Sequence, residues 1–173
     1  SVTITYSVDV SDYLTGGATL DSTGIRIAGN FADNGGKVGG LPMSNWSPTD
    51  AQSAMSDPDG DSIWTITISY DSINPNSVQY YKFVNGNWGG DETQVTSPYC
   101  GGLGGSGNDR FLDIAEDMTR CYDWNSCNSC LPACSYTFNA FDSFGDSWNG
   151  HAVDILVNGD TVVAAATVAT NFN

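Results

Sequence analysis

Aspartates at short spacing are the first residues in this sequence that could do chemistry. Asp57, Asp59 and Asp61 stand at alternate positions in a segment that also holds Gly60. Hard oxygen ligands at such spacing occur in calcium-binding loops, but an EF-hand needs glycine at the sixth position and glutamate at the twelfth. Gly60 is instead the fourth residue of this segment. Two interpretations therefore stand for the three aspartates, a calcium-binding turn and a solvated acidic turn.

A second oxygen-rich cluster lies near the end of the sequence. Asp142, Asp146 and Asn149 fall within one short stretch, and Asp154 follows. Several hard oxygen donors on a short loop suit calcium better than magnesium, which demands a regular octahedral site. Calcium is therefore the candidate cofactor at both clusters, with an ordinary acidic loop as the alternative. We expect no organic cofactor.

Paired carboxylates and the single histidine are the remaining candidates for catalysis. Asp91 and Glu92 are adjacent, and neighbouring residues of a strand point to opposite faces. A glycosidase instead needs two carboxyl groups that face each other across the scissile bond. His151 has no plausible serine or cysteine partner in the sequence, and no Gly-x-Ser-x-Gly motif is present. The sequence therefore predicts a protein that is not an enzyme.

Cysteines are confined to one region of the chain and bear on its compartment. The five cysteines are Cys100, Cys121, Cys127, Cys130 and Cys134. They contain one Cys-x-x-Cys pair, whereas four-cysteine zinc sites usually have two. Disulfides are the favoured interpretation, with zinc ligands and free thiols as alternatives, and they indicate an extracellular location, secreted or on a cell-surface appendage. Because five is odd, one cysteine is left over, and the connectivity cannot be read from the sequence.

Charge and composition exclude several classes of partner. The chain has 173 residues and a net charge of −15, with 20 acidic and 5 basic residues. Nucleic acids and anionic membranes need clusters of Lys and Arg, so neither is an expected partner. No apolar run of about 18 residues is present, so we expect no membrane insertion. Divalent cations and neutral sugars are compatible with this charge.

The elements that must position these residues are strands rather than helices. Val2, Ile4, Tyr6 and Val8 alternate with polar residues, which is the period of a half-buried strand. Similar runs occur at residues 25–28, 63–70, 78–84, 111–115, 136–141, 152–157 and 161–168. Turn residues separate the runs, among them Asn158-Gly159 between the last two. The pattern predicts an all-β fold, an antiparallel β-sandwich.

Three parts are predicted along the chain. Residues 1–120 form the β-sandwich, residues 121–134 form a disulfide-tied connector, and residues 135–173 form a small second β unit. A unit of this size with so few strands does not bury enough surface to fold alone. We therefore expect the second unit to be incomplete. The first domain, further chain or a strand from a neighbouring molecule would complete it.

Several motifs in residues 2–130 carry a resemblance to a known family. They occur in the family's order, at residues 24–31, 45–47, 59–64 and 80–92. With these motifs the chain resembles the starch- and glycogen-binding β-sandwiches of exported bacterial surface proteins, which have an immunoglobulin-like fold. Such copies also carry a cysteine after the Trp-Gly-x-Asp-Glu motif and a cysteine-rich exit, as this chain does. Residues 141–159 look like the start of another exported β module.

The resemblance implies a sugar-binding site. In glucan-binding relatives two tryptophans and a lysine form the sugar platform, and the matching positions here are Trp46, Lys82 and Trp88. An indole face stacks on the apolar face of a glucose ring, while the lysine donates to hydroxyl groups. The sequence departs from the family between Phe31 and Trp46, where residues 32–43 are inserted. Packing in the core or in a loop is the alternative for both tryptophans.

Two functions follow as expectations. The first is a structural subunit of an extracellular filament or surface assembly, a homopolymer whose copies add strands to one another. The strands expected to cross between copies contain Val2, Ile4, Tyr6, Val8, Val162, Val163 and Val168. The second is a glucan-binding module of a secreted multidomain protein, with a polysaccharide as its partner. The expected incompleteness of the second unit favours the structural function.

Overall fold

The computed structural model describes most of the chain and divides it into two units. It gives residues 1–71, 77–93, 95, 100–101 and 109–130 in full, and the backbone of Val153–Val157 and Asp160–Ala166. The two compact units are Ser1–Pro132 and Ala133–Asn173. The predicted connector, residues 121–134, straddles this division, because its first residues belong to a strand of the first unit.

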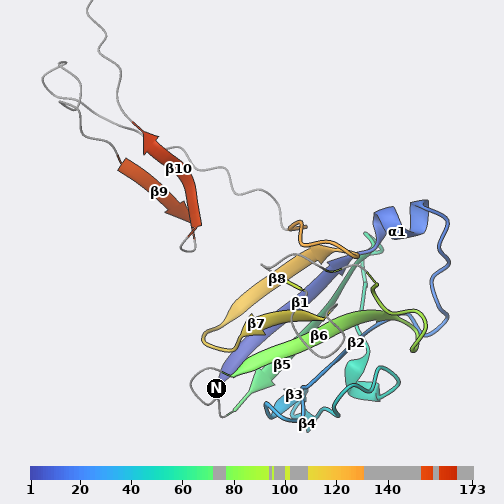
Figure 1. Ribbon diagram of the computed structural model, residues 1–173. Coiled ribbons are helices and arrows are strands. Elements are labelled where there is room, and N and C mark those ends of the chain that lie inside the picture. Colours follow the sequence, from blue (N-terminus) through green and yellow to red (C-terminus); the bar gives the residue numbers. More distant parts are fainter. Residues whose placement is uncertain are drawn as a thin grey trace, which may run out of the picture. The chain divides into compact units, whose positions relative to one another are not determined.

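The first unit is built from short strands joined by turns (Figure 1). Its strands are β1 (Val2–Asp9), β2 (Ile25–Gly29), β3 (Gly36–Val38), β4 (Leu41–Pro42), β5 (Ile63–Tyr70), β6 (Val78–Asn85), β7 (Arg110–Asp113) and β8 (Met118–Asp123). Two short helical elements, α1 (Ser11–Thr15) and η1 (Ala51–Ser53), lie between strands. Within the residues that the structure describes, no helix has the length and apolar character needed to cross a membrane.

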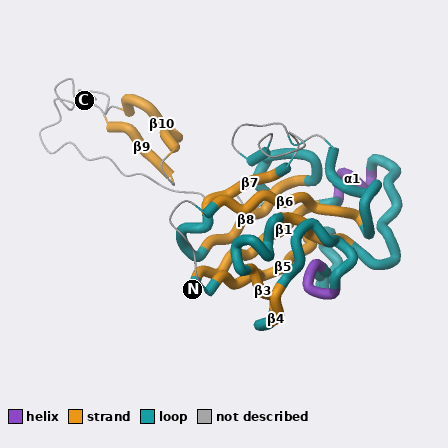
Figure 2. Tube along the Cα trace, turned by 60° about the horizontal axis from the view of Figure 1, so that its bottom comes forward, coloured by secondary structure: helices purple, strands orange, loops and turns teal. Residues whose placement is uncertain are grey.

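The strands of the first unit form two sheets (Figures 1 and 2). One sheet has five strands in the order β4-β3-β5-β1-β8, and the other has three in the order β2-β6-β7. Apolar side chains from both sheets belong to one core. The prediction of an all-β sandwich containing disulfides is therefore confirmed. The immunoglobulin-like strand order stays a prediction.

The core follows the alternation seen in the sequence. In β1, Ile4, Tyr6 and Val8 are fully buried while Thr3 is exposed, as expected for a strand with one face on the core. The neighbouring strand β5 and strands β2 and β6 of the other sheet supply further buried side chains, namely Ile25, Ile27, Ile66, Ile68, Tyr70, Tyr81 and Phe83. At the centre, the hydroxyl groups of Tyr6 and Tyr70 share a hydrogen bond of 2.7 Å. The predicted crossing residues of β1 therefore lie inside the core of their own unit.

Strand β8 was not expected from the sequence. It pairs with β1 from Ile4 opposite Met118 to Asp9 opposite Asp123, and this pairing is parallel, unlike the other strand pairs described. β1 itself lies between β8 and β5. Its pairing with β5 extends over the whole length of β1. The first and the last strand of the unit are thus neighbours in one sheet.

Short segments cover three of the four outer strands of the two sheets, while the fourth, β4, has only two residues. Residues 54–55 lie along β2, where the Met55 amide donates to Ile25 O at 3.1 Å. Residues 100–101 lie along β7, where the Phe111 amide donates to Cys100 O at 3.2 Å. Residues 128–130 lie along β8, through bonds of 3.0–3.2 Å. We call these three the edge-covering segments. They occupy backbone groups that would otherwise be open to another chain.

The described part of the second unit is a pair of strands. β9 (Val153–Val157) and β10 (Asp160–Ala166) pair antiparallel, with Asp160 opposite Val157 and two irregularities in register. Both strands were predicted, and the predicted Asn158-Gly159 turn and the strand at 136–141 lie outside the described residues. Among the strands that the structure describes, β9 and β10 pair only with each other.

Candidate functional site

The three residues predicted to bind sugar are held by the β2–β6 pair but not in one place. The Trp46 amide donates to Gly29 O at 2.7 Å, and Gly29 pairs with Tyr81 at one end of the ladder. Trp88 follows the other end, where Asn85 pairs with Ile25. Four residues of strand separate these ends, a length of about 13 Å. The ladder therefore places the two tryptophans at its opposite ends.

Lys82 is buried and held by neighbours in its own chain. Its ammonium group donates to Asp91 Oδ2 at 3.2 Å and to Glu92 O at 3.3 Å, and lies 3.8 Å from Asp109 Oδ1. Burial alone would raise the pKa of Asp91, but the hydrogen bond and charge of Lys82, together with backbone hydrogen bonds such as that from the Gly89 amide, outweigh burial and hold this pKa below its usual value. In this arrangement the lysine stabilises the fold and does not present its ammonium group to a ligand.

Trp88 is presented to solvent by a well-anchored turn. It is 47% exposed and, with Leu41 at 57%, is one of the two exposed large apolar residues of the described chain. Asn85 fixes the base of the turn, since its side chain accepts from the Asp21 amide and donates to Thr19 O. Gly86 has φ of 77°, and a Cβ there would meet Asp21 at 2.4 Å, so the position requires glycine. Trp88 is the predicted sugar contact that the structure leaves accessible.

The first predicted calcium cluster is closed by its own hydrogen bonds. One ligand oxygen each from Asp57, Asp59 and Asp61 lies within 4.8 Å of the others. Asp57 accepts from the amides of Gly60 and Ser62, and Asp61 accepts from that of Ile63. These bonds shape an acidic turn, as expected of aspartates in turns. The second predicted cluster, Asp142, Asp146 and Asn149, lies outside the described residues.

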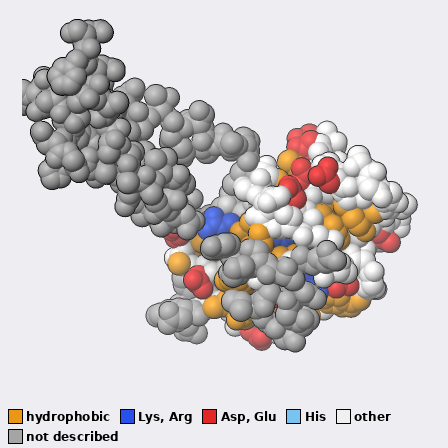
Figure 3. Space-filling view, turned by 45° about the horizontal axis from the view of Figure 1, so that its top comes forward, with side chains coloured by type: hydrophobic (Ala, Val, Ile, Leu, Met, Phe, Trp, Pro, Cys, Tyr) orange, Lys and Arg blue, Asp and Glu red, His pale blue; other side chains and the backbone are white. Residues whose placement is uncertain are grey.

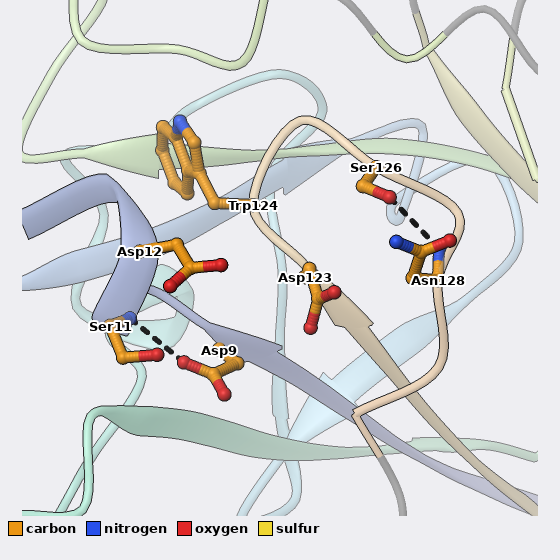
Figure 4. Close-up of a pocket in the computed structure, with 7 residues that line it drawn as sticks. All are labelled: Asp9, Ser11, Asp12, Asp123, Trp124, Ser126 and Asn128. Carbon is orange, nitrogen blue, oxygen red and sulfur yellow. Dashed lines mark hydrogen bonds between the residues drawn. The ribbon is translucent and has the colours of Figure 1, made fainter. Parts of the chain in front are cut away.

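A small polar pocket was not expected from the sequence (Figure 4). It has a volume of about 170 Å³ and forms where β1 ends, α1 begins and β8 ends. Its walls are Asp9, Ser11, Asp12, Asp123, Trp124, Ser126 and Asn128. The parallel register of β1 and β8 creates it, because Asp9 and Asp123 are paired at the strand ends. Trp124 is stacked on Tyr13 beside it, with ring centroids 4.6 Å apart.

The adjacent acids Asp91 and Glu92 point to different partners. Asp91 pairs with Lys82, whereas Glu92 is fully buried and forms an ion pair with Arg110 at 2.6 Å. The expectation that these two carboxylates do not act together agrees with this arrangement. Neither of them lines the polar pocket. No step of acid–base catalysis is therefore assigned to the pair.

Four of the five cysteines form disulfides. Cys100 is bonded to Cys127, and Cys121 is bonded to Cys130. The prediction of disulfides is confirmed, and the structure supplies the connectivity that the sequence left open. Cys134 lies outside the described residues. Disulfides of this kind form in an oxidising compartment.

The comparisons with known proteins add no relative. No family model, no curated protein and no solved structure matches the chain. The fold and the disulfides therefore define the class of protein, which is a disulfide-containing β-sandwich followed by a β-hairpin unit.

Proposed function

We propose that the chain is a non-enzymatic structural subunit of an extracellular assembly, joined to copies of itself by strand pairing through β9 and β10. One contrast carries this proposal. Of the four outer strands of the first unit, β2, β7 and β8 lie under edge-covering segments and β4 is only the two residues Leu41–Pro42, whereas β9 and β10 are longer and are described as paired only with each other. Unpaired edges are the places where another chain adds a strand.

The contact between copies is assigned to the second unit rather than to the first strand. β1 is hydrogen-bonded on both sides, and Val2, Ile4, Tyr6 and Val8 are buried. Releasing β1 would open the core, which is unfavourable at roughly 25 cal/mol for each Å² of apolar surface exposed. Of the predicted contact residues of the second unit, Val162 and Val163 lie in β10, and Val168 lies outside the described residues.

The described pair of strands in the second unit, β9 and β10, needs further strands to be stable. Isolated hairpins are marginally stable in water, and three or more strands are usually needed. Pairing between hairpins of two copies satisfies the edge amides and carbonyls of both partners. If that contact is head-to-tail, it does not close and propagates into a fibre.

The chemistry of the chain supports the extracellular location in this proposal. The two disulfides require an oxidising environment to persist. The net charge of −15 of the chain opposes nonspecific association at high concentration. On the face shown in Figure 3, acidic side chains lie at several separated places.

Electron microscopy and light scattering of the oxidised full chain test the proposal. We expect regular assemblies that are lost in Val163→Lys, because a charge on β10 opposes pairing between sheets. Thr67→Lys is the matched control, since it adds the same charge to an exposed position of β5 and should leave assembly intact. Monodisperse single particles of the unmodified chain, at every concentration tried, would refute the proposal.

Glucan binding is a second candidate, and the exposure of Trp88 favours it. An indole at the tip of an anchored turn suits stacking on a sugar ring. Retention on a starch column should disappear in Trp88→Ala and persist in Leu41→Ala, which removes the other exposed apolar side chain. Equal elution of all three proteins with a non-binding reference would exclude this candidate.

A further inference from the structure

The two disulfides of the first unit are alike in burial. Each joins a buried cysteine to a half-buried one, Cys100 to Cys127 and Cys121 to Cys130. Cys100 is 1% exposed and Cys121 is 3% exposed. Because the partner cysteines of both disulfides fall in the same half-buried class, residue exposure does not distinguish one disulfide from the other.

Arg110 distinguishes the surroundings of the two disulfides. Its Nη1 group donates a hydrogen bond to Cys100 Sγ at 3.4 Å. The Nε and Nη2 groups of the same guanidinium donate to Glu92, which leaves Nη1 as the group that donates to the sulfur. The guanidinium also lies over the rings of Phe83 and Tyr122, 5.2 and 4.9 Å from their centroids. For Cys121 and Cys130, the described chain shows no hydrogen bond from a cationic side chain to sulfur.

This hydrogen bond bears on thiol–disulfide exchange. When a thiolate attacks one sulfur of a disulfide, the other leaves as a thiolate, and a better-stabilised leaving group accelerates the step. A buried anion is unfavourable unless it is paired or hydrogen-bonded. Attack on the Cys127 sulfur releases the Cys100 thiolate beside the Arg110 guanidinium. The thiolate and the Glu92 carboxylate then both interact with this one positive charge. Attack on the Cys130 sulfur releases a buried Cys121 thiolate without such a donor among the described residues.

We propose that Cys100–Cys127 is a redox-active disulfide, opened by a dithiol ahead of Cys121–Cys130. One thiolate of the dithiol attacks Cys127 Sγ, the protein S–S bond breaks, and Cys100 leaves as a thiolate. The second thiol of the dithiol then displaces Cys127 from the mixed disulfide. The dithiol loses two electrons and two protons and closes to its own disulfide, while the two cysteines gain them and become thiols.

Opening this disulfide loosens one of the edge-covering segments. Residues 100–101 cover β7 through the Phe111 amide, which donates to Cys100 O, and through a bridge between Gly101 and Arg110. Without the bond to Cys127, this segment is held along β7 by backbone hydrogen bonds. Reduction removes one tether and therefore favours release of this segment from the edge of the three-stranded sheet. The reactivity of this disulfide does not depend on assembly through β9 and β10.

Timed reduction of the oxidised full chain tests the proposal. The protein is treated with limiting dithiothreitol, quenched with an alkylating reagent and mapped by mass spectrometry. We expect Cys100 and Cys127 to be alkylated at least about tenfold faster than Cys121 and Cys130, as one charge-assisted hydrogen bond to the leaving thiolate would give. Equal rates, or the reverse order, would overturn the proposal.

A double variant separates the contribution of Arg110 from access. Arg110→Met with Glu92→Gln removes both charges, while the glutamine keeps one acceptor oxygen for one of the two amides, of Phe83 and Asn125, that donate to Glu92. The ratio of the two reduction rates should then fall to about one, and an unchanged ratio would show that Arg110 is not the cause. Should this variant not fold, the order of opening in the unmodified protein decides. Amide exchange at Phe111 should also accelerate after selective reduction, and unchanged exchange would refute release of the edge.

Discussion

Glu92 and Arg110 form a fully buried ion pair at the junction of the two sheets with the cysteine-rich loop. The two side chains are joined by bonds of 2.6 and 2.9 Å. Glu92 also accepts from the amides of Phe83 and Asn125, and Arg110 donates to Asp123 O. Burial alone would lower the pKa of Arg110, but the charge of Glu92, its hydrogen bonds and the nearby Tyr81 and Tyr122 together outweigh burial and raise this pKa. Arg110 is therefore charged in the folded protein.

Breaking this pair from one side should destabilise the protein strongly. Glu92→Gln leaves the Arg110 charge buried without its partner, which typically lowers the free energy of unfolding by about 3–5 kcal/mol. Urea denaturation measures the change. Asp91→Asn is the control, because its partner Lys82 keeps the Glu92 carbonyl as acceptor and Asp91 is partly exposed. A loss in Glu92→Gln no larger than in the control would contradict the importance given to the pair.

Alkaline pH should destabilise the core through its tyrosines. Burial raises the pKa of Tyr6 and of Tyr70 well above the ordinary value near 10. Above that value the unfolded chain releases these protons while the folded chain retains them, so stability falls as the pH rises further. Below it both states are neutral, and the contribution is complete. Thermal melts between about pH 8 and 11 test this, and a flat melting temperature across that range would contradict it.

Two buried tyrosines should respond oppositely to loss of the hydroxyl group. Tyr6→Phe removes the hydrogen bond to Tyr70 and should lower the free energy of unfolding by about 1 kcal/mol. The Tyr81 hydroxyl has no hydrogen-bond partner in the described structure. Tyr81→Phe should therefore be neutral or stabilising, since no buried polar group is left unpaired. Chemical denaturation of both variants provides the comparison, and a larger loss in Tyr81→Phe would indicate a partner for that hydroxyl.

The disulfides should stabilise the fold to different extents. Cys100–Cys127 spans 27 residues of sequence and Cys121–Cys130 spans 9. The loop-entropy estimate for the longer span is about 3–4 kcal/mol and for the shorter about 2–3 kcal/mol. We expect Cys100→Ser with Cys127→Ser to lower the urea midpoint more than the other pair of substitutions does. The reverse order would point to strain or to structure in the unfolded chain.

Calcium binding by the aspartate turn carries its own test. An ion held by Asp57, Asp59 and Asp61 would bind only the folded state and raise the melting temperature. A chelator should lower the melting temperature of the unmodified protein and leave that of Asp59→Asn unchanged. An identical curve with and without saturating chelator would remove calcium from these residues.

The alternation of apolar and polar residues in the sequence predicted the strands that have one face packed on the core. β1, β5 and β6 have that pattern, because their side chains alternate between core and solvent or a covering segment. β3 and β4 were missed because they are short and lie among glycines. β8 was missed because it lies in the region whose cysteines indicated a connector.

The spacing of residues in the sequence does not show which side chains far apart in the chain contact each other in the fold. Glu92 and Arg110 are 18 residues apart, and the strand pairing that joins them is not visible in a local pattern. Lys82 matched a sugar-binding position by motif, but burial gave it the partners Asp91 and Asp109 instead. The polar pocket depends on the register that sets Asp9 beside Asp123, which only the folded sheet defines.

The neighbourhood of β1 and β8 also fixes the order in which the first unit can be completed. A chain that emerges N-terminus first makes β1 long before its parallel partner, and the ladder from Ile4 to Met118 closes almost the whole unit into one loop. Such non-local pairing slows folding relative to proteins rich in local contacts. Until β8 arrives, one side of β1 stays open to mispairing. Cys121 belongs to β8. The Cys121–Cys130 disulfide therefore links the last strand of the five-stranded sheet to the segment that follows it.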